Sequence, residues 1–193
     1  MKIFIILLLT TFRLFADDKL PPVGEVIKLK GKVYLDNKQI HLGDKIEKPG
    51  TLTTKESSII QIKINEWKNI ITIGANSTMN LNLNDEKKYT LKNGVCRWKS
   101  FAPSQSKGKI FTPAVSLGVR GTNFLLSYNE LLEETEIVMF DGIVHFENIK
   151  DTNNAYDLEK NQWGGLGGRF GQKINPPLNL NEELIKKFNK TLE

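Results

Sequence analysis

The stretch that decides the fold is residues 112–126, which read TPAVSLGVRGTNFLL. Val115, Leu117 and Val119 alternate with small residues, a pattern typical of a strand with one buried face. Gly121 then supplies backbone freedom at a point where a residue with a Cβ would be strained. Apolar residues resume the alternation after it, so the segment predicts a strand that runs through a glycine-dependent irregularity.

This stretch resembles the signature of the FecR domain, a Thr-Pro corner followed by Gly-Val-Arg-Gly-Thr-x-Phe. The matching residues are Thr112, Pro113, Ala114, Gly118, Val119, Arg120, Gly121, Thr122 and Phe124. Residues 135–146 resemble the strand, turn and strand that follow the signature in that family. The resemblance spans roughly residues 24–165 of the chain.

Two dipeptides predict tight hairpins. Asn93-Gly94 and Asp141-Gly142 are the residue types that two-residue hairpin turns favour, and each lies between alternating apolar runs. We therefore expect each pair to join two antiparallel strands. Residues 129–134 and the polar residues 151–155 predict further turns or loops.

About ten or more short strands follow one another at a spacing of roughly 8 to 12 residues, which predicts an all-β sandwich, barrel or β-solenoid. The chain contains no regular internal repeat. The family resemblance favours a compact, solenoid-like wrap of short strands. The expected fold class is all-β, with one short C-terminal helix.

The C-terminal segment reads as an amphipathic helix that starts after Asn181, a good N-cap with two glutamates behind it. Leu184, Phe188 and Leu192 recur every four residues on one face. A helix this short needs a surface to pack on. We expect that surface to be the β domain of the same chain, with a partner protein as the alternative.

The N-terminus reads as an export signal, because Lys2 precedes an apolar run that ends near Ala16. The run is too short to cross a bilayer, which needs about 20 apolar residues. We expect cleavage after Ala16, a periplasmic or secreted location, and no stable membrane insertion of the mature chain. The expected organisation is a signal peptide over 1–16, a lead-in over 17–22, a FecR-like all-β domain over 23–165, and a Gly/Pro-rich connection with the helix over 166–193.

Charge argues against nucleic-acid binding. The chain has 27 basic and 22 acidic residues, and cleavage after Ala16 would remove Lys2 and Arg13, leaving 25 against 22. Nucleic-acid-binding proteins usually carry a basic patch or a domain-wide excess. Here the two signs are interspersed, so a solvated surface is the better interpretation.

No catalytic or metal-binding constellation is evident. His41 and His145 are the only histidines, and a zinc site needs three or four clustered ligands. Cys96 is the only cysteine, so no internal disulfide can form, and no neighbouring base would activate its thiol. We predict a protein that is not an enzyme and uses neither metal nor cofactor.

Three residues are candidates for recognition. Trp67 and Trp163 could stack on sugar rings, although core packing is the commoner role of a tryptophan. Arg120 could bind backbone carbonyls or pair with Asp141 or Glu136 through its planar fork of donors. Alternatively, it could present its guanidinium to a partner.

The leading hypothesis is therefore an exported module that binds another envelope protein. The resemblance implies a link to signalling, since FecR-type proteins join a cytoplasmic anti-sigma segment and one membrane span to a periplasmic part that senses a TonB-dependent receptor. We expect this chain to represent only the periplasmic part. The second hypothesis is recognition of cell-wall or surface glycan, and the third is a hydrolase with an unrecognised site.

Overall fold

The computed structural model describes residues 24–64, 69–82, 89–100 and 108–192 of the 193-residue chain. Fifteen strands in this part of the chain belong to one hydrogen-bonded network. One 3-10 turn and one α-helix complete the described regular structure. The all-β prediction with a single C-terminal helix is confirmed.

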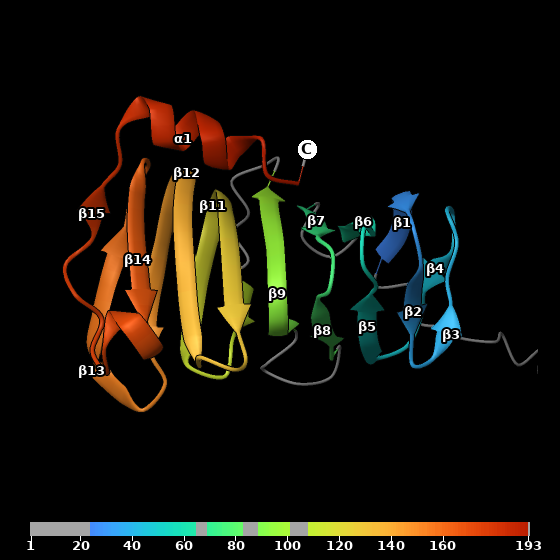
Figure 1. Ribbon diagram of the computed structural model, residues 1–193, viewed down its shortest axis with the longest axis horizontal. Coiled ribbons are helices and arrows are strands. Elements are labelled where there is room, and N and C mark those ends of the chain that lie inside the picture. The colour runs from blue at the N-terminus through green and yellow to red at the C-terminus, as the bar shows by residue number, and fades with distance from the viewer. Residues whose placement is uncertain (1–23, 65–68, 83–88, 101–107, 193) are drawn as a thin grey trace, which may run out of the picture.

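The elements follow one another along the long axis of the molecule, from the blue N-terminal strands to the orange C-terminal strands (Figure 1). In chain order they are β1 (Gly24–Lys30), β2 (Val33–Leu35), β3 (Lys38–Gln39), β4 (Lys45–Ile46), β5 (Gly50–Thr54), β6 (Ile59–Ile64), β7 (Asn69–Ile73), β8 (Thr78–Leu81), β9 (Tyr89–Ser100), β10 (Gly108–Phe111), β11 (Val115–Asn129), β12 (Glu134–Asn148), β13 (Asp151–Leu158), β14 (Gln162–Leu166), η1 (Gly168–Phe170), β15 (Leu178–Asn179) and α1 (Glu182–Asn189). This progression is the solenoid-like wrap that the family resemblance favours.

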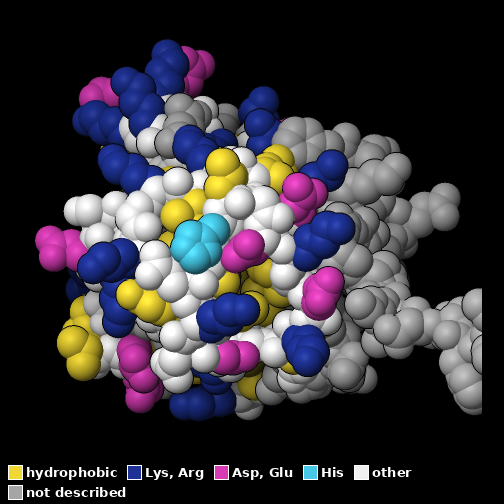
Figure 2. Space-filling model, turned by 90° about the vertical axis from the view of Figure 1, so that its right-hand side faces the viewer, with side chains coloured by type: hydrophobic (Ala, Val, Ile, Leu, Met, Phe, Trp, Pro, Cys, Tyr) yellow, Lys and Arg dark blue, Asp and Glu magenta, His cyan; other side chains and the backbone are white. Residues whose placement is uncertain are grey.

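Strand pairing divides the wrap into two layers around one core. The first layer runs from β3 and β2 through β5, β8 and β10 to β13. The second runs from β4 and β1 through β6 and β7 to β14 and β15. Figure 2 views the end at which the N-terminal strands of both layers lie.

Three long strands belong to both layers and pass from one to the other at a glycine. β9 pairs with β8 up to Asn93 and with β7 and β11 beyond it. β11 and β12 likewise change their outer neighbours around Gly121 and Gly142. The glycines have positive φ angles, 95° at Gly94, 59° at Gly121 and 78° at Gly142. The layers are thus joined by bent strands.

Both predicted hairpins are wrong for the same physical reason. Asn93-Gly94 lies inside the continuous strand β9, and Asp141-Gly142 lies inside β12. An Asx-Gly pair indicates that the backbone readily adopts a positive φ. A β-bulge inside a continuous strand satisfies that preference as well as a hairpin turn does. The pairing register shifts near both dipeptides, as expected for bulges.

Residues 151–155 are also not the loop that their polarity predicts. They form the first part of β13, which pairs with β12 on one side. Asn154 faces Ile174, whose backbone nitrogen donates to Asn154 Oδ1 (2.7 Å) and whose oxygen accepts from Nδ2 (3.1 Å). Residues 151–155 therefore begin an edge strand. The Asn154 side chain makes the hydrogen bonds to Ile174 that the backbone of a neighbouring strand would otherwise make.

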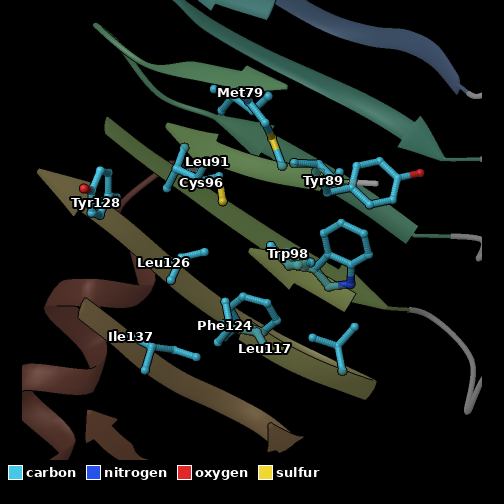
Figure 3. Packing of buried hydrophobic residues seen from close by; sticks show 14 of the residues in the cluster. Met79, Tyr89, Leu91, Cys96, Trp98, Leu117, Phe124, Leu126, Tyr128 and Ile137 are labelled. Carbon is cyan, nitrogen blue, oxygen red and sulfur yellow. The ribbon is translucent and has the colours of Figure 1, made fainter. Parts of the chain in front are cut away.

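The core is filled from the alternating positions of the strands of both layers (Figure 3). Trp98, Phe124 and Leu126 have no exposed surface, and the rings of Tyr89 and Trp98 meet edge to face with centroids 5.5 Å apart. Leu125, between two core residues of β11, points to the outer face of the second layer and belongs to a separate cluster there. That layer is thus apolar on both faces in its middle.

Helix α1 covers this outer cluster, as expected for docking onto its own domain. Asn181 caps it, since its Oδ1 accepts from the backbone nitrogen of Leu184 at 2.9 Å. Ile185, Phe188 and Leu192 pack on the cluster, whereas Leu184 is 39% exposed. The predicted apolar face is therefore wrong at Leu184, because the helix is rotated so that Ile185 meets the sheet instead.

Arg97 of β9 holds the C-terminal end of α1. Its Nη1 donates to the Asn189 backbone oxygen at 2.7 Å and its Nη2 to Asn189 Oδ1 at 2.6 Å. Its Nε donates to Asn123 Oδ1 at 3.1 Å, and its Cζ lies 4.7 Å from the centre of the Phe140 ring. A positive charge at this position also suits the negative end of the helix dipole.

The crossing of β11 and β12 requires a glycine, and Gly142→Ala tests this. A Cβ at Gly142 would lie 2.5 Å from the Gly121 carbonyl oxygen, at a φ of +78°. We expect a loss of about 3 kcal/mol of unfolding free energy, measured by urea denaturation. Gly43→Ala is the control, because Gly43 has a φ of +86° with no atom near the added Cβ. It should cost about 1 kcal/mol, and equal losses would contradict the steric argument.

The clamp on α1 can be tested with Arg97→Lys. Lysine keeps the charge but cannot donate two bonds to Asn189 through a planar fork, so the helix should become less stable by about 1 to 2 kcal/mol. Faster amide hydrogen exchange in α1 would report this. Lys187→Ala, which removes only an exposed pair with Glu183, should leave exchange nearly unchanged. Equal exchange in both variants would exclude the clamp.

Candidate functional site

The family-type signature residues build the corner at which β11 and β12 change layers. Gly142 lies against the Gly121 carbonyl oxygen with no room for a Cβ, and Phe124 begins the next core stretch with no exposed surface. Thr122 is 1% exposed, and its hydroxyl has no hydrogen-bond partner in the described part of the chain. Asp141 is exposed beside the corner. Both glycines therefore lie at the point where the two strands change layers.

The start of the signature is a tight turn that enters β11. Thr112 Oγ1 accepts from the backbone nitrogens of Ala114 (3.2 Å) and Val115 (3.1 Å) and is 2.8 Å from the Thr135 hydroxyl in the core. This arrangement fixes the turn against β12. Pro113 is left exposed at the rim of a surface hollow.

The remaining signature residues lie on the first layer. Val119 is 6% exposed and belongs to the core, and Gly118 pairs with His145 across the strands. The Arg120 backbone pairs with Ile143, but the Arg120 side chain lies outside the described residues. Trp67 lies outside them as well, so neither residue is brought into a described site.

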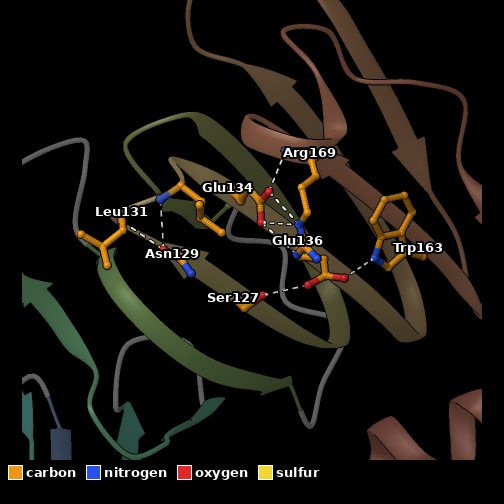
Figure 4. Close-up of polar contacts among 8 residues, drawn as sticks. Ser127, Asn129, Leu131, Glu134, Glu136, Trp163 and Arg169 are labelled. Atoms are coloured by element: carbon orange, nitrogen blue, oxygen red, sulfur yellow. Dashed lines mark hydrogen bonds and ion pairs between the residues drawn. The ribbon is translucent and has the colours of Figure 1, made fainter.

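The most exposed large apolar side chain among the described residues lies in the turn between β11 and β12, which we call the leucine turn (residues 130–133). Leu131 is 94% exposed and Leu132 is 48% exposed. The turn is nevertheless well held, because Asn129 Oδ1 accepts from both leucine nitrogens at 3.0 and 3.1 Å (Figure 4). The predicted turn at 129–134 is confirmed, and its leucines project from a fixed backbone.

Two surface hollows flank the leucine turn, and Leu131 lines both. One has a volume of about 480 Å³ and lies beside Pro113, Tyr128 and Leu166. The other has a volume of about 580 Å³ and extends over the outer face of the second layer, past Ser127. A projecting apolar side chain between two concavities is a shape that a partner surface can enclose.

Glu134 and Arg169 close one side of this region (Figure 4). Arg169 Nε donates to Oε1 at 2.9 Å and Nη2 donates to Oε2 at 2.9 Å. The Arg169 backbone nitrogen donates to Oε1 at 2.6 Å. The side-chain bonds, followed by the backbone bond and the charge of Arg169, lower the pKa of Glu134. The pair ties the η1 turn to the start of β12.

Trp163 is anchored in the same region. Its Nε1 donates to Glu136 Oε1 at 2.9 Å, while Ser127 Oγ lies 3.5 Å from Glu136 Oε2. Its ring meets Phe170 edge to face at 5.0 Å and packs on the cluster beneath α1. Trp163 is therefore held by one hydrogen bond and by packing contacts within the domain.

The leucine turn is acidic. Glu130 and Glu133 flank the two leucines and are exposed. Burial is the main cause that raises the pKa of Tyr128, and the negative charges of Glu133 and Glu130 raise it further. The turn therefore presents negative charge beside its apolar side chains.

The two histidines and the one cysteine lie in separate parts of the described structure. His145 Nδ1 lies 2.7 Å from Asp157 Oδ1 on the surface of the first layer, whereas His41 contacts Asp44 in a separate turn. Within the described ranges, no three His, Cys, Asp or Glu side chains could hold a metal ion. Burial raises the pKa of the Cys96 thiol to about 12, so it stays protonated at neutral pH.

Sequence reasoning recognised the leucine turn as a turn but gave it no role. Its exposure depends on how far the two strands extend, which alternation does not reveal. The Glu134–Arg169 pair joins residues 35 positions apart, so no local pattern indicates it. An acidic stretch that contains two adjacent leucines was the only available signal.

The Glu134–Arg169 pair predicts a specific acid sensitivity. A carboxyl whose folded pKa lies below its ordinary value of 4.5 stabilises the fold above that value, and this contribution is lost as the pH falls through the lowered pKa. In Glu134→Gln, the melting temperature should be lower at neutral pH and should fall less between about pH 6 and about pH 3. Thermal unfolding followed by circular dichroism measures both. Glu183→Gln, with only an exposed pair to Lys187, should behave like the parent, and a parallel pH profile for Glu134→Gln would refute the assignment.

Comparison with known proteins gives one family match. Residues 50–145, from the start of β5 into β12, match the family described as FecR protein. No curated protein matches the chain. In the described part of the chain, no helix combines the length and hydropathy needed to cross a membrane.

Two crystal structures share the fold. Both are described as a "putative anti-sigma factor" from Parabacteroides distasonis ATCC 8503, at 1.65 and 2.50 Å resolution. They superimpose with TM-scores of 0.59 and 0.60 at 10% sequence identity, over 73% and 74% of this chain. The chain spans 65% of the length of these neighbours, and at this identity the likeness concerns the fold alone.

Proposed function

The chain is a FecR-domain protein, and from this premise we propose that it is a non-enzymatic module that binds a protein partner in the bacterial envelope. The supporting observation is the leucine turn, with one leucine 94% exposed on a backbone fixed by Asn129. A pre-ordered apolar side chain loses little conformational freedom on binding. Such side chains can carry much of the energy of an interface.

The partner surface that fits this turn has an apolar pocket bordered by basic residues. The pocket would take Leu131 and Leu132, and the basic border would face Glu130 and Glu133. The hollows beside the turn give room for partner side chains on both sides. Glu134 contributes less to this attraction, since Arg169 already neutralises it.

A role in envelope signalling is the setting that we propose for this binding. The FecR family match and the fold shared with a neighbour described as an anti-sigma factor support it. The proposed location is the periplasm, after removal of residues 1–16. The proposed organisation remains a lead-in over 17–22, the all-β domain over 23–165, and the connection with α1 over 166–193.

Site-specific photo-cross-linking in intact cells tests the proposal. A photoreactive residue at position 131 should give one discrete protein adduct, whereas the same residue at position 184 should not. Leu184 is a suitable control because it is also surface-exposed, at 39%, but lies on α1. Introducing Leu131→Asp with the photoreactive residue at 132 should reduce the adduct at least about tenfold, as expected for a hot spot.

The outcome also separates protein binding from glycan binding. No adduct at 131, or the same adducts from 131 and 184, would contradict the leucine turn as the binding site. Co-sedimentation with purified peptidoglycan that is lost on Trp163→Ala or Trp67→Ala would favour the glycan hypothesis instead. Circular dichroism of the tryptophan variants checks that the fold is intact, since Trp163 also packs against Phe170.

A further inference from the structure

The Asn93 side chain joins two turns of the surface. Its Nδ2 donates to the backbone oxygen of Asn76 at 3.1 Å, in the turn between β7 and β8 (residues 74–77). Its Oδ1 accepts from the backbone nitrogen of Glu130 at 3.2 Å, in the leucine turn. Asn76, Asn93 and Leu131 all line the hollow of about 580 Å³. Asn93, which does not form the predicted hairpin, therefore bridges two walls of this hollow.

The bridge lies where β9 leaves β11. The two strands pair as far as Gly94 and Tyr128, and at Asn93 the strand β9 pairs with β8 instead. Gly94 has a φ of +95° and lies so close to Ser77 that no Cβ would fit. This close approach brings the Asn93 side chain to Asn76, while its oxygen reaches back to the leucine turn.

The turn at residues 74–77 is a firm anchor for the bridge. The buried Thr54 hydroxyl donates to the Gly74 oxygen at 2.5 Å and accepts from the Ser77 nitrogen at 2.9 Å. Ser77 is also buried, and its hydroxyl accepts from the Val95 nitrogen at 3.0 Å. Hydrogen bonds between buried groups are costly to break. A side chain bonded to this turn is therefore held against a well-fixed part of the domain.

The leucine turn is held differently. Asn129 Oδ1 accepts from the nitrogens of Leu131 and Leu132 and so fixes the local shape of the turn. The pairing of β11 with β12 ends at Asn129 and Glu134. These contacts lie within the β11–β12 pair and do not tie its tip to a third strand. The bond from Asn93 of β9 does so, across 37 positions of sequence.

We propose that Asn93 is a positioning residue for partner binding at the leucine turn, an inference that rests on the function proposed above. Asn93 holds the tip of the turn in the orientation in which the partner's pocket accepts Leu131. A side chain presented in one orientation loses less freedom on binding. Asparagine suits this position because its short amide side chain carries both a donor for Asn76 and an acceptor for Glu130.

Amide hydrogen exchange of the purified protein tests the positioning without any partner. Asn93→Leu keeps the approximate size of the side chain and loses both bonds, so the Glu130 amide should exchange about fivefold faster, as expected for one lost hydrogen bond. Asn93→Asp keeps the acceptor and loses the donor, and its rate should lie between those of the parent and Asn93→Leu. The Phe124 amide in the core should keep its rate in both variants, because the bridge acts locally.

Asn80→Leu is the matched control. Asn80 is another strand asparagine with a side-chain bond, which its Oδ1 accepts from the Thr51 hydroxyl at 3.2 Å, and it lies on β8 away from the leucine turn. Exchange at Glu130 should be unchanged in this variant. Equal rates at Glu130 in the parent and in Asn93→Leu would overturn the proposal, whatever the cross-linking shows.

Cross-linking in intact cells then tests the effect on binding. With the photoreactive residue at position 132, Asn93→Leu should reduce the protein adduct about fivefold, Asn93→Asp should reduce it less, and Asn80→Leu should not reduce it. A full adduct from Asn93→Leu, despite faster exchange at Glu130, would overturn the positioning role and leave the proposed function standing. A parent that gives no adduct would instead overturn the proposed function, and the positioning role with it.

Discussion

The fold depends on the contact between Gly121 and Gly142, where the two longest strands bend together from one layer into the other. Both backbones have positive φ angles, and a Cβ on Gly142 would lie 2.5 Å from the Gly121 oxygen. Because the strands continue through the bend, the two layers are joined by hydrogen-bonded strands that keep their register on either side. Buried side chains from both layers therefore belong to one continuous core.

This corner also determines what the surface presents. Beyond it, β11 and β12 stay paired as far as Asn129 and Glu134, so the leucine turn that joins them is short and fixed. The same register sets Phe124 in the core and Leu125 on the outer face, where it forms the cluster that α1 covers. The projecting leucines and the docked helix are thus two consequences of one pairing.

Alternation allowed a buried strand face to be predicted, as for Val115, Leu117 and Val119 in β11. Glycine chemistry correctly indicated unusual backbone at Gly94 and Gly142. The glycines alone could not distinguish a bend within one strand from a hairpin turn between two strands. The outcome depends on whether the neighbouring strand continues past the glycine. The Arg97–Asn189 contact joins residues 92 positions apart, and no local pattern specifies such a pair. The helix was foreseen, but its rotation depends on the shape of the sheet beneath it.

The pKa values of two described groups, Glu134 and Cys96, are shifted by their surroundings. A general acid at neutral pH needs a raised carboxyl pKa, and a nucleophilic cysteine needs a lowered thiol pKa. Here both shifts have the opposite sign, since Arg169 lowers the pKa of Glu134 and burial raises that of Cys96 to about 12. Glu134 is committed to holding the η1 turn, and Glu136 to holding Trp163. The exposed charges at the leucine turn are acidic and flank apolar side chains, and the proposed binding role rests on this arrangement.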